Sequence, residues 1–262
     1  MIQVVIPMTG YGSRFVKAGY THLKPFIKVF GKTMIEWIVS MYDQDSTEFV
    51  FICRSAHLVN DKDFQKLPFI AKHVKIIPIY DWIKLGPVND FCKAYETNEI
   101  DKSLPTIVNY CDLFCLWNSR SFIEECLDRD VDGSIPCYTG FHPNLIPKKN
   151  VYASCKVNSD QYLEEIREKF SFEEDKMLAH HSAGIYYFRS GETAYHYSNE
   201  LMNNDNDSLN GEFYTSLVYN YLVKDSKKVW CPDNIKFYCQ WGTPEDLEDF
   251  NMWMNVLKGA CK

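Results

Sequence analysis

The stretch that decides the fold is IPMTGYGSRF, residues 6–15, where an apolar run turns into a loop with two glycines. The apolar run Ile2–Met8 predicts a short buried strand. Gly10 and Gly12 let the backbone approach a polyphosphate closely, because they carry no side chain. Consecutive N–H groups in such a loop can bind an anion, and the guanidinium of Arg14 adds a positive charge that can donate two parallel hydrogen bonds. The stretch therefore predicts a strand followed by a phosphate-binding loop.

Two familiar phosphate loops fit this stretch poorly. The dinucleotide fingerprint needs a third glycine where Phe15 stands. A Walker A loop ending in the Gly-Lys-Thr run at Gly31 would need a glycine at Phe26. The remaining interpretation is a loop that holds a nucleoside triphosphate through backbone groups, Arg14 and Lys24. A plain β-turn with two solvated cations stays open as the alternative.

Strand and helix signals alternate along the first half of the chain. Apolar runs predict strands over residues 48–53, 74–80 and 106–111, and helical spacing predicts helices over residues 33–42, 88–97 and 119–130. After about residue 132, short strand-like segments predict mixed or antiparallel strands, with helices over 192–202 and 211–223. Such alternation implies right-handed βαβ units. We therefore predict an α/β fold with a mixed, mostly parallel central sheet.

The composition is that of a folded acidic protein. Of the 262 residues, 46% are hydrophobic and 15% aromatic, which excludes a disordered chain and suffices for one large domain. Lys plus Arg is 28 and Asp plus Glu is 35, a net charge of −7, so we expect no nucleic-acid partner. No apolar run is long enough for a membrane span, and no signal peptide is evident. None of the ten cysteines forms a CxxC pair, so we expect a cytoplasmic protein with reduced, core-filling thiols.

Asp112 follows the apolar run 106–111 directly. In open α/β sheets ligands bind beyond the carboxyl ends of the strands, which is also where the glycine loop should lie. A carboxylate there can hold Mg²⁺ against triphosphate oxygens, since Mg²⁺ needs only one or two carboxylates besides phosphates and water. A helix N-cap or a turn residue is the structural alternative.

The longer stretch from residue 6 to residue 36, IPMTGYGSRFVKAGYTHLKPFIKVFGKTMIE, resembles the opening of the nucleotidyltransferases that make sugar nucleotides. That family has a strand, a Gly-x-Gly-Thr/Ser-Arg loop, a Lys-Pro turn and a Gly-Lys-Pro-Met-Ile-Glu helix start. This chain departs from the pattern at Thr9, where the family usually has Ala, at His22-Leu23, and at Thr33, where it usually has Pro. The resemblance extends weakly over most of the chain. It is similar in particular to a bacterial branch associated with capsule and surface-polysaccharide gene clusters.

The resemblance implies a Rossmann-like, GT-A-like three-layer α/β/α fold in one domain, with a nucleotide-binding half over residues 1–131 and an acceptor-binding half over 132–262. It implies that Arg14 and Lys24 are catalytic cations and that Asp112 holds Mg²⁺. The predicted nucleotide-binding residues are Met8, Thr9, Gly10, Tyr11, Gly12, Ser13, Gly86 and Asn109. The predicted acceptor-binding residues, from the family's Glu-Lys motif and small-residue turn, are Glu168, Lys169 and Gly184.

Several of these implied roles have plainer alternatives. A turn at the start of a helix would also contain a glycine such as Gly86. An exposed, charged turn would also contain a pair such as Glu168-Lys169. A second metal ligand is expected late in the chain, but Ser216 or Leu217 stands where many relatives carry Asp. Glu212 is the first candidate for that ligand and Asp246 the second. The alternatives are a first-turn helix acid for Glu212 and a helix-capping acid for Asp246.

The predicted function is nucleotidyl transfer. CTP, UTP or dTTP would react with a phosphorylated acceptor, most simply a sugar 1-phosphate, to give an activated sugar for capsule or surface polysaccharide and pyrophosphate. The alternatives are a cytidylyltransferase acting on a phosphorylated alcohol, polyol, amide or phosphonate, and a non-catalytic relative. A glycosyltransferase would usually present Asp-x-Asp, whereas Leu113-Phe114 follows Asp112. The sequence permits a homodimer and distinguishes neither the base nor the acceptor.

Overall fold

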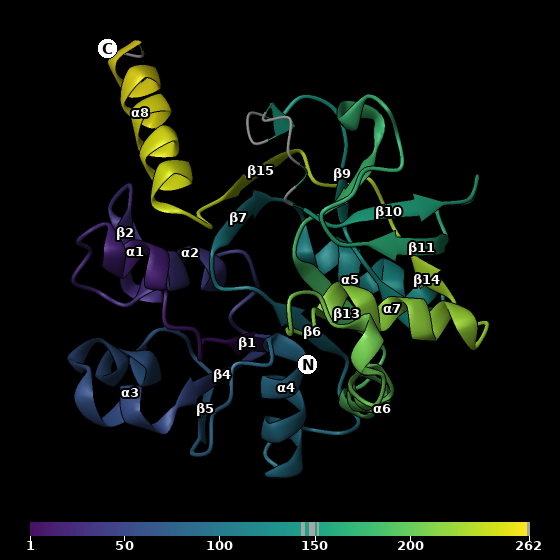
Figure 1. The fold of residues 1–262 in the computed structure, drawn as a ribbon, viewed down its shortest axis with the longest axis horizontal. Coiled ribbons are helices and arrows are strands. Elements are labelled where there is room, and N and C mark those ends of the chain that lie inside the picture. Colours follow the sequence, from purple (N-terminus) through teal and green to yellow (C-terminus); the bar gives the residue numbers. More distant parts are fainter. Residues whose placement is uncertain (143–144, 147–149, 151, 261–262) are drawn as a thin grey trace.

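The computed structural model describes residues 1–142, 145–146, 150 and 152–260. Its centre is a seven-stranded sheet in the order β14-β8-β13-β6-β1-β4-β5 (Figure 1). The strands of this sheet are β1 (Ile2–Pro7), β4 (Thr47–Arg54), β5 (Val74–Ile79), β6 (Thr106–Asn109), β8 (Gly133–Ser134), β13 (Ile185–Phe188) and β14 (Val229–Trp230). Within it, β13 runs antiparallel to its neighbours β6 and β8, and the other pairs are parallel. The predicted mixed, mostly parallel sheet is confirmed.

Helices cover both faces of this sheet, which gives three layers. The α-helices of the described chain are α1 (Ser13–Lys17), α2 (Met34–Val39), α3 (Ser55–Asn60), α4 (Pro87–Glu96), α5 (Ser119–Asp128), α6 (Gly191–Met202), α7 (Thr215–Lys224) and α8 (Pro244–Ala260). Of these, α8 packs against β15 and extends away from the central sheet (Figure 1). Alternation along β1 explains the layers, because successive strand side chains point to opposite faces. Val4 and Ile6 pack in the cluster that contains α2 and α5 side chains, and Val5 packs with α4, α6 and α7.

Smaller sheets extend the second half of the chain. An antiparallel sheet of four strands has the order β11-β10-β12-β9. These strands are β9 (Cys137–Tyr138), β10 (Ser154–Val157), β11 (Leu163–Arg167) and β12 (His180–Ser182). Two further pairs are β2 (Lys28–Val29) with β3 (Lys32–Thr33), and β7 (Leu113–Leu116) with β15 (Phe237–Gln240). In the last pair Gln240 lies opposite Leu113, so a late segment of the chain reaches the residue that follows Asp112.

The helix predicted from residue 211 begins later than expected. The left-handed φ of Gly211, +75°, and the extended backbone of Tyr214 keep residues 211–214 in a turn, and α7 starts at Thr215. Glu212 therefore lies before the helix, so its interpretation as a first-turn helix acid is wrong. Its side chain is free to face another part of the molecule.

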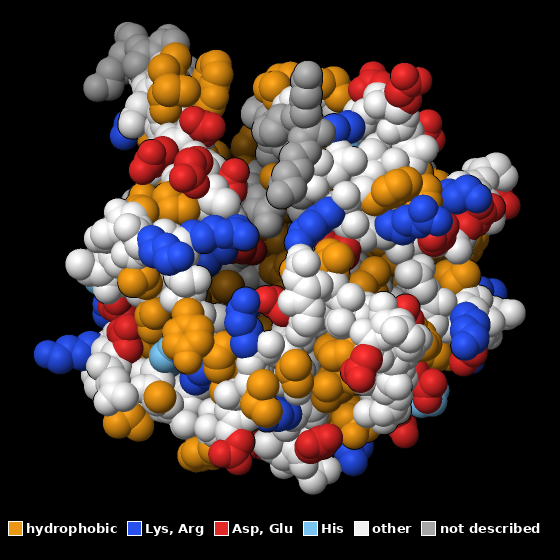
Figure 2. Space-filling model, viewed as in Figure 1, with side chains coloured by type: hydrophobic (Ala, Val, Ile, Leu, Met, Phe, Trp, Pro, Cys, Tyr) orange, Lys and Arg blue, Asp and Glu red, His pale blue; other side chains and the backbone are white. Residues whose placement is uncertain are grey.

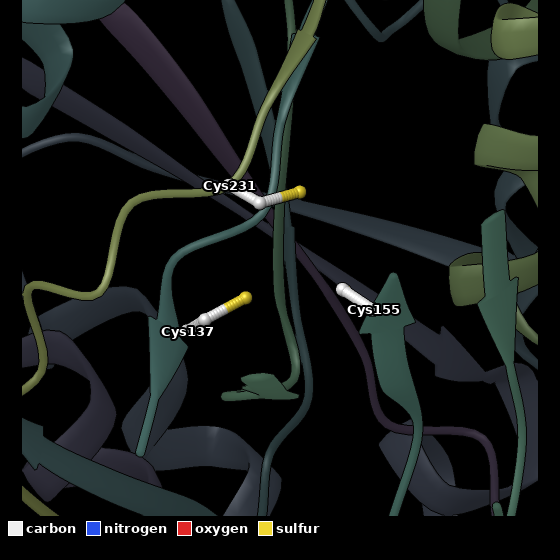
Figure 3. Close-up of side chains that lie close together, drawn as sticks. All are labelled: Cys137, Cys155 and Cys231. Carbon is white, nitrogen blue, oxygen red and sulfur yellow. The ribbon is translucent and has the colours of Figure 1, made fainter. Parts of the chain in front are cut away.

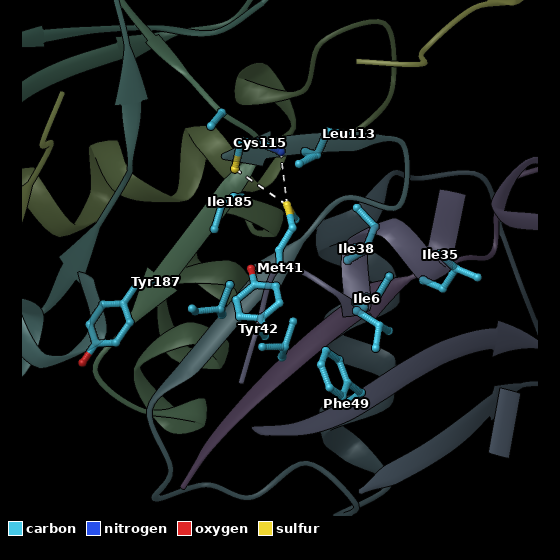
Figure 4. Close-up of a cluster of buried hydrophobic side chains, with 14 of the residues drawn as sticks. Ile6, Ile35, Ile38, Met41, Tyr42, Phe49, Leu113, Cys115, Ile185 and Tyr187 are labelled. Atoms are coloured by element: carbon cyan, nitrogen blue, oxygen red, sulfur yellow. Dashed lines mark hydrogen bonds between the residues drawn. The ribbon is translucent and has the colours of Figure 1, made fainter. Parts of the chain in front are cut away.

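A buried cluster holds β7 against α2 (Figure 4). Met41, just beyond α2, accepts a hydrogen bond from the Cys115 amide at 3.3 Å and contacts the Cys115 thiol at 3.7 Å. Ile6, Ile38 and Leu113 pack around this contact, each no more than 1% exposed. Burying such side chains is the main stabilising contribution to a fold. The cluster fixes β7, and with it the position of the preceding Asp112.

Three buried thiols meet where the central and four-stranded sheets join (Figure 3). The sulfur atoms of Cys137, Cys155 and Cys231 lie within 4.8 Å of one another, and the nine described cysteines are all free. Burial raises the pKa of Cys137 and Cys231 well above the usual range, so these thiols stay protonated. A divalent ion on three thiolates would leave a net negative charge in this core, which is costly. We interpret the cluster as core packing.

Among the described residues, no helix combines the length and the apolar character that crossing a bilayer requires.

Candidate active site

The loop after β1 forms one wall of a cavity of about 350 Å³, and the segment before α4 forms the facing wall. This cavity, called here the nucleotide cavity, is lined by residues 8–13 together with Arg14, Lys24, Gly86 and Glu212, among others. Figure 2 shows the same face of the molecule hollowed near its centre, with Lys and Arg side chains around the hollow. Most of the predicted nucleotide-binding residues therefore line one space.

Two glycines allow the close approaches that shape this cavity. Gly12 has a left-handed φ of +58°, and a Cβ there would lie 3.1 Å from the Cβ of Lys24. Gly86 has a φ of +93°, and a Cβ there would lie 2.6 Å from the carbonyl oxygen of Phe213. Glycine adopts such backbone readily and, having no Cβ, also permits these close contacts. Gly86 thus brings the turn before α7 to the cavity, where Glu212 pairs with Lys84 at 2.6 Å.

One predicted nucleotide contact lies elsewhere. Asn109 is fully buried at the end of β6 and is not among the residues that line the nucleotide cavity. Its Oδ1 accepts a hydrogen bond from the Tyr42 hydroxyl at 2.6 Å, and its Nδ2 donates to the Tyr110 carbonyl at 2.7 Å. The structure thus places Asn109 in the core, where it supports the strand that leads to Asp112.

Lys24 and Asp112 meet at the edge of the nucleotide cavity. The ammonium of Lys24 lies 2.5 Å from Asp112 Oδ2 and donates a second hydrogen bond, at 3.2 Å, to the Gly242 carbonyl. Both side chains are largely buried, with 18% and 15% of their surface exposed. The short helical turn Lys24–Phe26 sets the lysine, and Pro25 stiffens its start. Asp112 follows β6 in a bend, and the cap of α5 is Asn118 instead, so the N-cap alternative for Asp112 is wrong.

A second cavity, also of about 350 Å³, adjoins the first, and Arg14 and Gly242 line both. This acceptor cavity is lined by the predicted residues Glu168, Lys169 and Gly184. Its remaining wall is rich in aromatic side chains, namely Tyr110, Tyr152, Tyr186, Tyr214 and Tyr238. The structure thus brings together residues from both halves of the chain, as two cavities that share Arg14 and Gly242.

The two charged residues that line the acceptor cavity, Glu168 and Lys169, have different surroundings. Glu168 accepts a hydrogen bond from the Ser216 hydroxyl, and burial raises the pKa of its carboxyl above the usual range. The ammonium nitrogen of Lys169 lies 5.6 Å from the centre of the Tyr214 ring. Gly184 has a φ of +74°, and a Cβ there would lie 2.8 Å from a methyl group of Leu113. The glycine therefore keeps the floor of the cavity close to β7.

The carboxylates beside Lys24 have the chemistry that Mg²⁺ prefers. Asp112 offers an oxygen beyond the one that contacts Lys24, and Asp246 lies close enough for both residues to act on it electrostatically. Asp246 also has the capping role that the sequence offered for it: its Oδ2 accepts a hydrogen bond from the Thr243 amide at 2.9 Å, and its own amide donates to the Thr243 hydroxyl at 3.2 Å. Burial raises the pKa of Asp246, while these hydrogen bonds with Thr243 lower it. Glu212 points instead to Lys84 at the other side of the nucleotide cavity. One or two carboxylates are sufficient for a magnesium ion that also binds phosphates.

Sequence reasoning missed several residues that line these cavities or contact their walls. Arg54 is in the lining of neither cavity, but its guanidinium stacks on two residues of the nucleotide cavity, 3.7 Å from the ring centre of Tyr11 and 4.7 Å from that of Trp82. Gln240 lines the acceptor cavity, and Asp90 lines the nucleotide cavity. The strand-end rule that selected Asp112 also applies to Arg54, the last residue of β4. The sequence held no comparable signal for Asp90.

Comparisons with known proteins identify the fold. No protein-family model and no curated protein matches the sequence. A nucleoside-diphosphate-sugar pyrophosphorylase of Vibrio cholerae superposes with a TM-score of 0.75 at 21% identity, over 95% of this chain and 99% of that one. A protein provisionally assigned as a glucose-1-phosphate thymidylyltransferase of Bacillus anthracis, solved with sucrose, gives 0.73 at 16% identity, over 97% and 95%. HddC of Yersinia pseudotuberculosis, solved with GMP-PN, gives 0.63 at 19%, over 97% and 100%. The chain shares the Rossmann-like fold of these solved structures, the fold that its sequence resemblance implied.

Proposed function

We propose that this protein is a nucleotidyltransferase that joins a nucleoside triphosphate to a phosphorylated acceptor, most simply a sugar 1-phosphate, and releases pyrophosphate. The observation that carries the proposal is the pair of adjoining cavities with Arg14 and Gly242 in both walls and Lys24 at their junction. A transfer between two bound substrates needs such a shared boundary, because the reacting atoms must come within about 3–3.5 Å of each other. The nucleotide-sugar enzymes that share the fold support the substrate class.

The proposed chemistry is a single displacement at the α-phosphorus. An oxygen of the acceptor phosphate forms a bond to that phosphorus, the bond to the bridging oxygen of the β-phosphate breaks, and pyrophosphate leaves with the electron pair. The attacking phosphate is already ionised near pH 7, so no general base is needed. Positioning and neutralisation of charge then supply the rate enhancement.

Each cation near the junction has a distinct part. Arg14, in the first turn of α1 directly after the glycine loop, lines the nucleotide cavity, where its charge would stabilise the leaving pyrophosphate. Lys24, held by Asp112 and the Gly242 carbonyl, lies where it can contact both the α-phosphate and the incoming phosphate. Asp112, with Asp246 near it, would hold Mg²⁺, which supplies further positive charge to the phosphate oxygens when bound.

The setting of the reaction belongs to the same proposal. We infer CTP, UTP or dTTP as the nucleotide, capsule or surface polysaccharide as the destination of the product, and the cytoplasm as its location. A homodimer is compatible with these features. The sequence resemblance to the capsule-associated branch supports the destination of the product.

The aromatic wall of the acceptor cavity favours a second candidate. Five tyrosines beside one Glu-Lys pair suit a phosphorylated molecule with apolar parts as well as a sugar. The alternative is a cytidylyltransferase that activates a phosphorylated alcohol, polyol, amide or phosphonate. It uses the same cations and the same displacement, and differs only in what occupies the acceptor cavity.

The test is pyrophosphate release with Mg²⁺, each common nucleoside triphosphate, and a panel of sugar 1-phosphates and phosphorylated small molecules. Release that depends on one acceptor supports nucleotidyl transfer and identifies that acceptor. Release only with a non-sugar acceptor favours the second candidate. Absence of triphosphate binding by calorimetry would overturn the assignment of the loop at residues 10–14.

A further inference from the structure

Arg54 lies between the two segments that form the walls of the nucleotide cavity. β4 pairs with β1 on one side and with β5 on the other, so its last residue lies between the loop after β1 and the segment after β5 (Figure 1). These two segments carry Tyr11 and Trp82, which line the cavity. The guanidinium carbon of Arg54 lies 3.7 Å from the ring centre of Tyr11 and 4.7 Å from that of Trp82. One side chain therefore contacts both walls.

The guanidinium of Arg54 is largely buried and has no carboxylate partner within the described part of the chain. The residue is 8% exposed, forms no salt bridge there, and its Nε finds no hydrogen-bond acceptor. A terminal nitrogen contacts Nε2 of His57, and burial together with the nearby guanidinium lowers the pKa of that imidazole to about 4. His57 is therefore neutral near pH 7 and accepts this hydrogen bond. A buried cation without a counter-ion is costly, and the faces of the two aromatic rings offset part of that cost.

Two other contacts join the same walls. The Thr9 hydroxyl donates a hydrogen bond to Asp90 of α4, and the rings of Tyr11 and Trp82 meet edge to face with their centres 5.1 Å apart. Tyr11 is nevertheless 55% exposed, so packing alone holds its ring weakly. Arg54 is in the lining of neither cavity, so any effect of its stacking on a bound molecule passes through the two rings.

We propose that Arg54 is a positioning residue for the nucleotide, which holds Tyr11 and Trp82 together and so fixes the two walls of the nucleotide cavity before the nucleotide binds. This inference rests on the proposed function, which places a nucleoside triphosphate in that cavity. A loop that is already held in place loses less conformational freedom on binding, so preorganisation increases affinity. Because the guanidinium touches no reacting group, its loss should raise the KM for the nucleotide and leave kcat unchanged.

The first experiment measures binding of CTP, UTP and dTTP by calorimetry with Mg²⁺, for the wild type, Arg54→Met and Arg54→Lys. Arg54→Met keeps an unbranched side chain and loses the planar cation, so the bound nucleotide should be held about tenfold more weakly, within what two largely desolvated cation–π contacts allow. Arg54→Lys keeps the charge and loses the planar face, so it should restore little of that affinity. Arg129→Met is the matched control, because it removes a guanidinium 4.4 Å from the ring centre of Trp230, and neither residue lines a cavity. It should bind nucleotide as the wild type does.

Two further measurements test the route of the effect. Tyr11→Leu removes the ring from an exposed loop position, and adding Arg54→Met to it should weaken binding by less than about threefold more, since the two residues act as a unit. Amide hydrogen exchange of the protein without nucleotide should become faster over residues 8–13 and 81–86 in Arg54→Met. Exchange in β13 should stay at the wild-type rate, because only the two walls are released.

Each other result has a definite meaning. Wild-type affinity in Arg54→Met overturns the inference and leaves the proposed function intact. Wild-type affinity in Arg54→Lys overturns it as well, and assigns the effect to charge alone. Fully additive weakening in the double variant contradicts a role through Tyr11, and faster exchange in β13 as well as in the two walls assigns Arg54 to the stability of the whole fold. Absence of triphosphate binding in the wild type would overturn the proposed function itself.

Discussion

The Lys24 ammonium lies 2.5 Å from Asp112 Oδ2, although 88 residues separate the two in sequence. One residue comes from the turn after α1 and the other from the bend after β6. Their contact therefore depends on the parallel pairing of β1 with β6, which brings the carboxyl ends of both strands to one edge of the sheet. This ion pair marks the place where the nucleotide and acceptor cavities meet.

Lys24→Ala should lower kcat for pyrophosphate release by about 10²–10³-fold, because one preorganised cation is lost from the transition state. The fold should persist, since the side chain lies at a cavity and outside the apolar core. Steady-state kinetics and a circular-dichroism melt give the two measurements. Lys28→Ala removes a nearby exposed lysine and should leave turnover near the wild-type rate. Normal turnover in Lys24→Ala would remove this residue from the mechanism.

Asp112→Asn should raise the Mg²⁺ concentration for half-maximal activity by about tenfold or more, as the loss of one charged ligand implies. We expect Asp246→Asn to act in the same direction, because the amide oxygen can still accept from the Thr243 amide and only the charge is lost. Glu212→Gln should change the metal titration little, since that carboxylate pairs with Lys84. A metal titration that moves only with Glu212→Gln would assign the second ligand to Glu212.

Asp90→Asn should stabilise the fold at pH 7. The pKa of this carboxyl is about 6 in the folded state and 3.8 is its ordinary value, so the folded state binds more protons in that window. The free energy of unfolding therefore falls as pH rises from about 4 to about 6. Above pH 6, the ionised Asp90 carboxylate lowers it by roughly 3 kcal/mol. Urea unfolding should show a gain of up to that size at pH 7 and almost none at pH 4. Glu96→Gln should show no such pH dependence, and an equal gain at both pH values would contradict the assignment.

Lys169→Ala should raise the KM for the acceptor by about tenfold or more and leave the KM for the nucleotide within about twofold, because a charged contact to phosphate is lost from one cavity only. Lys169 lines the acceptor cavity and is absent from the lining of the nucleotide cavity. Lys156→Ala, on the exposed side of β10, serves as the control. A rise in KM for both substrates would place Lys169 at the shared boundary instead.

Local patterns were sufficient to predict the sheet and one cavity wall. The apolar run before Gly10 and the alternation of strands with helices fixed the class of fold, since both depend on neighbours in sequence. The glycines of residues 8–14 predicted an open loop after β1 for the same reason, and these residues line the nucleotide cavity. The strand-end rule then placed Asp112 at the correct edge.

Contacts between distant segments could not be predicted in this way. Gln240 reaches the acceptor cavity because β15 pairs with β7 in a register that no local pattern encodes. Asp90 carries no local signal, since an acid in the first turn of a helix is usually a favourable dipole contact. Asn109 is a polar residue at a strand end, where a ligand contact is expected, but its side chain accepts a hydrogen bond from Tyr42 in the core. In each case the packing of a remote element decides the role.

The reversed strand β13 has an evolutionary consequence. Because it runs against β6, its first residues lie beside the end of β6, so Gly184 and the cavity that it lines open at the same edge as the phosphate loop. The two cavities are nevertheless lined mostly by different stretches of chain: the nucleotide cavity by residues before Asp112, except Glu212 and Gly242, and the acceptor cavity by residues after 151, except Arg14, Tyr110 and Leu113. Mutations in the second stretch can therefore change the accepted molecule while the nucleotide apparatus stays intact. A fold with this division of labour can diversify its products by altering one half of its gene.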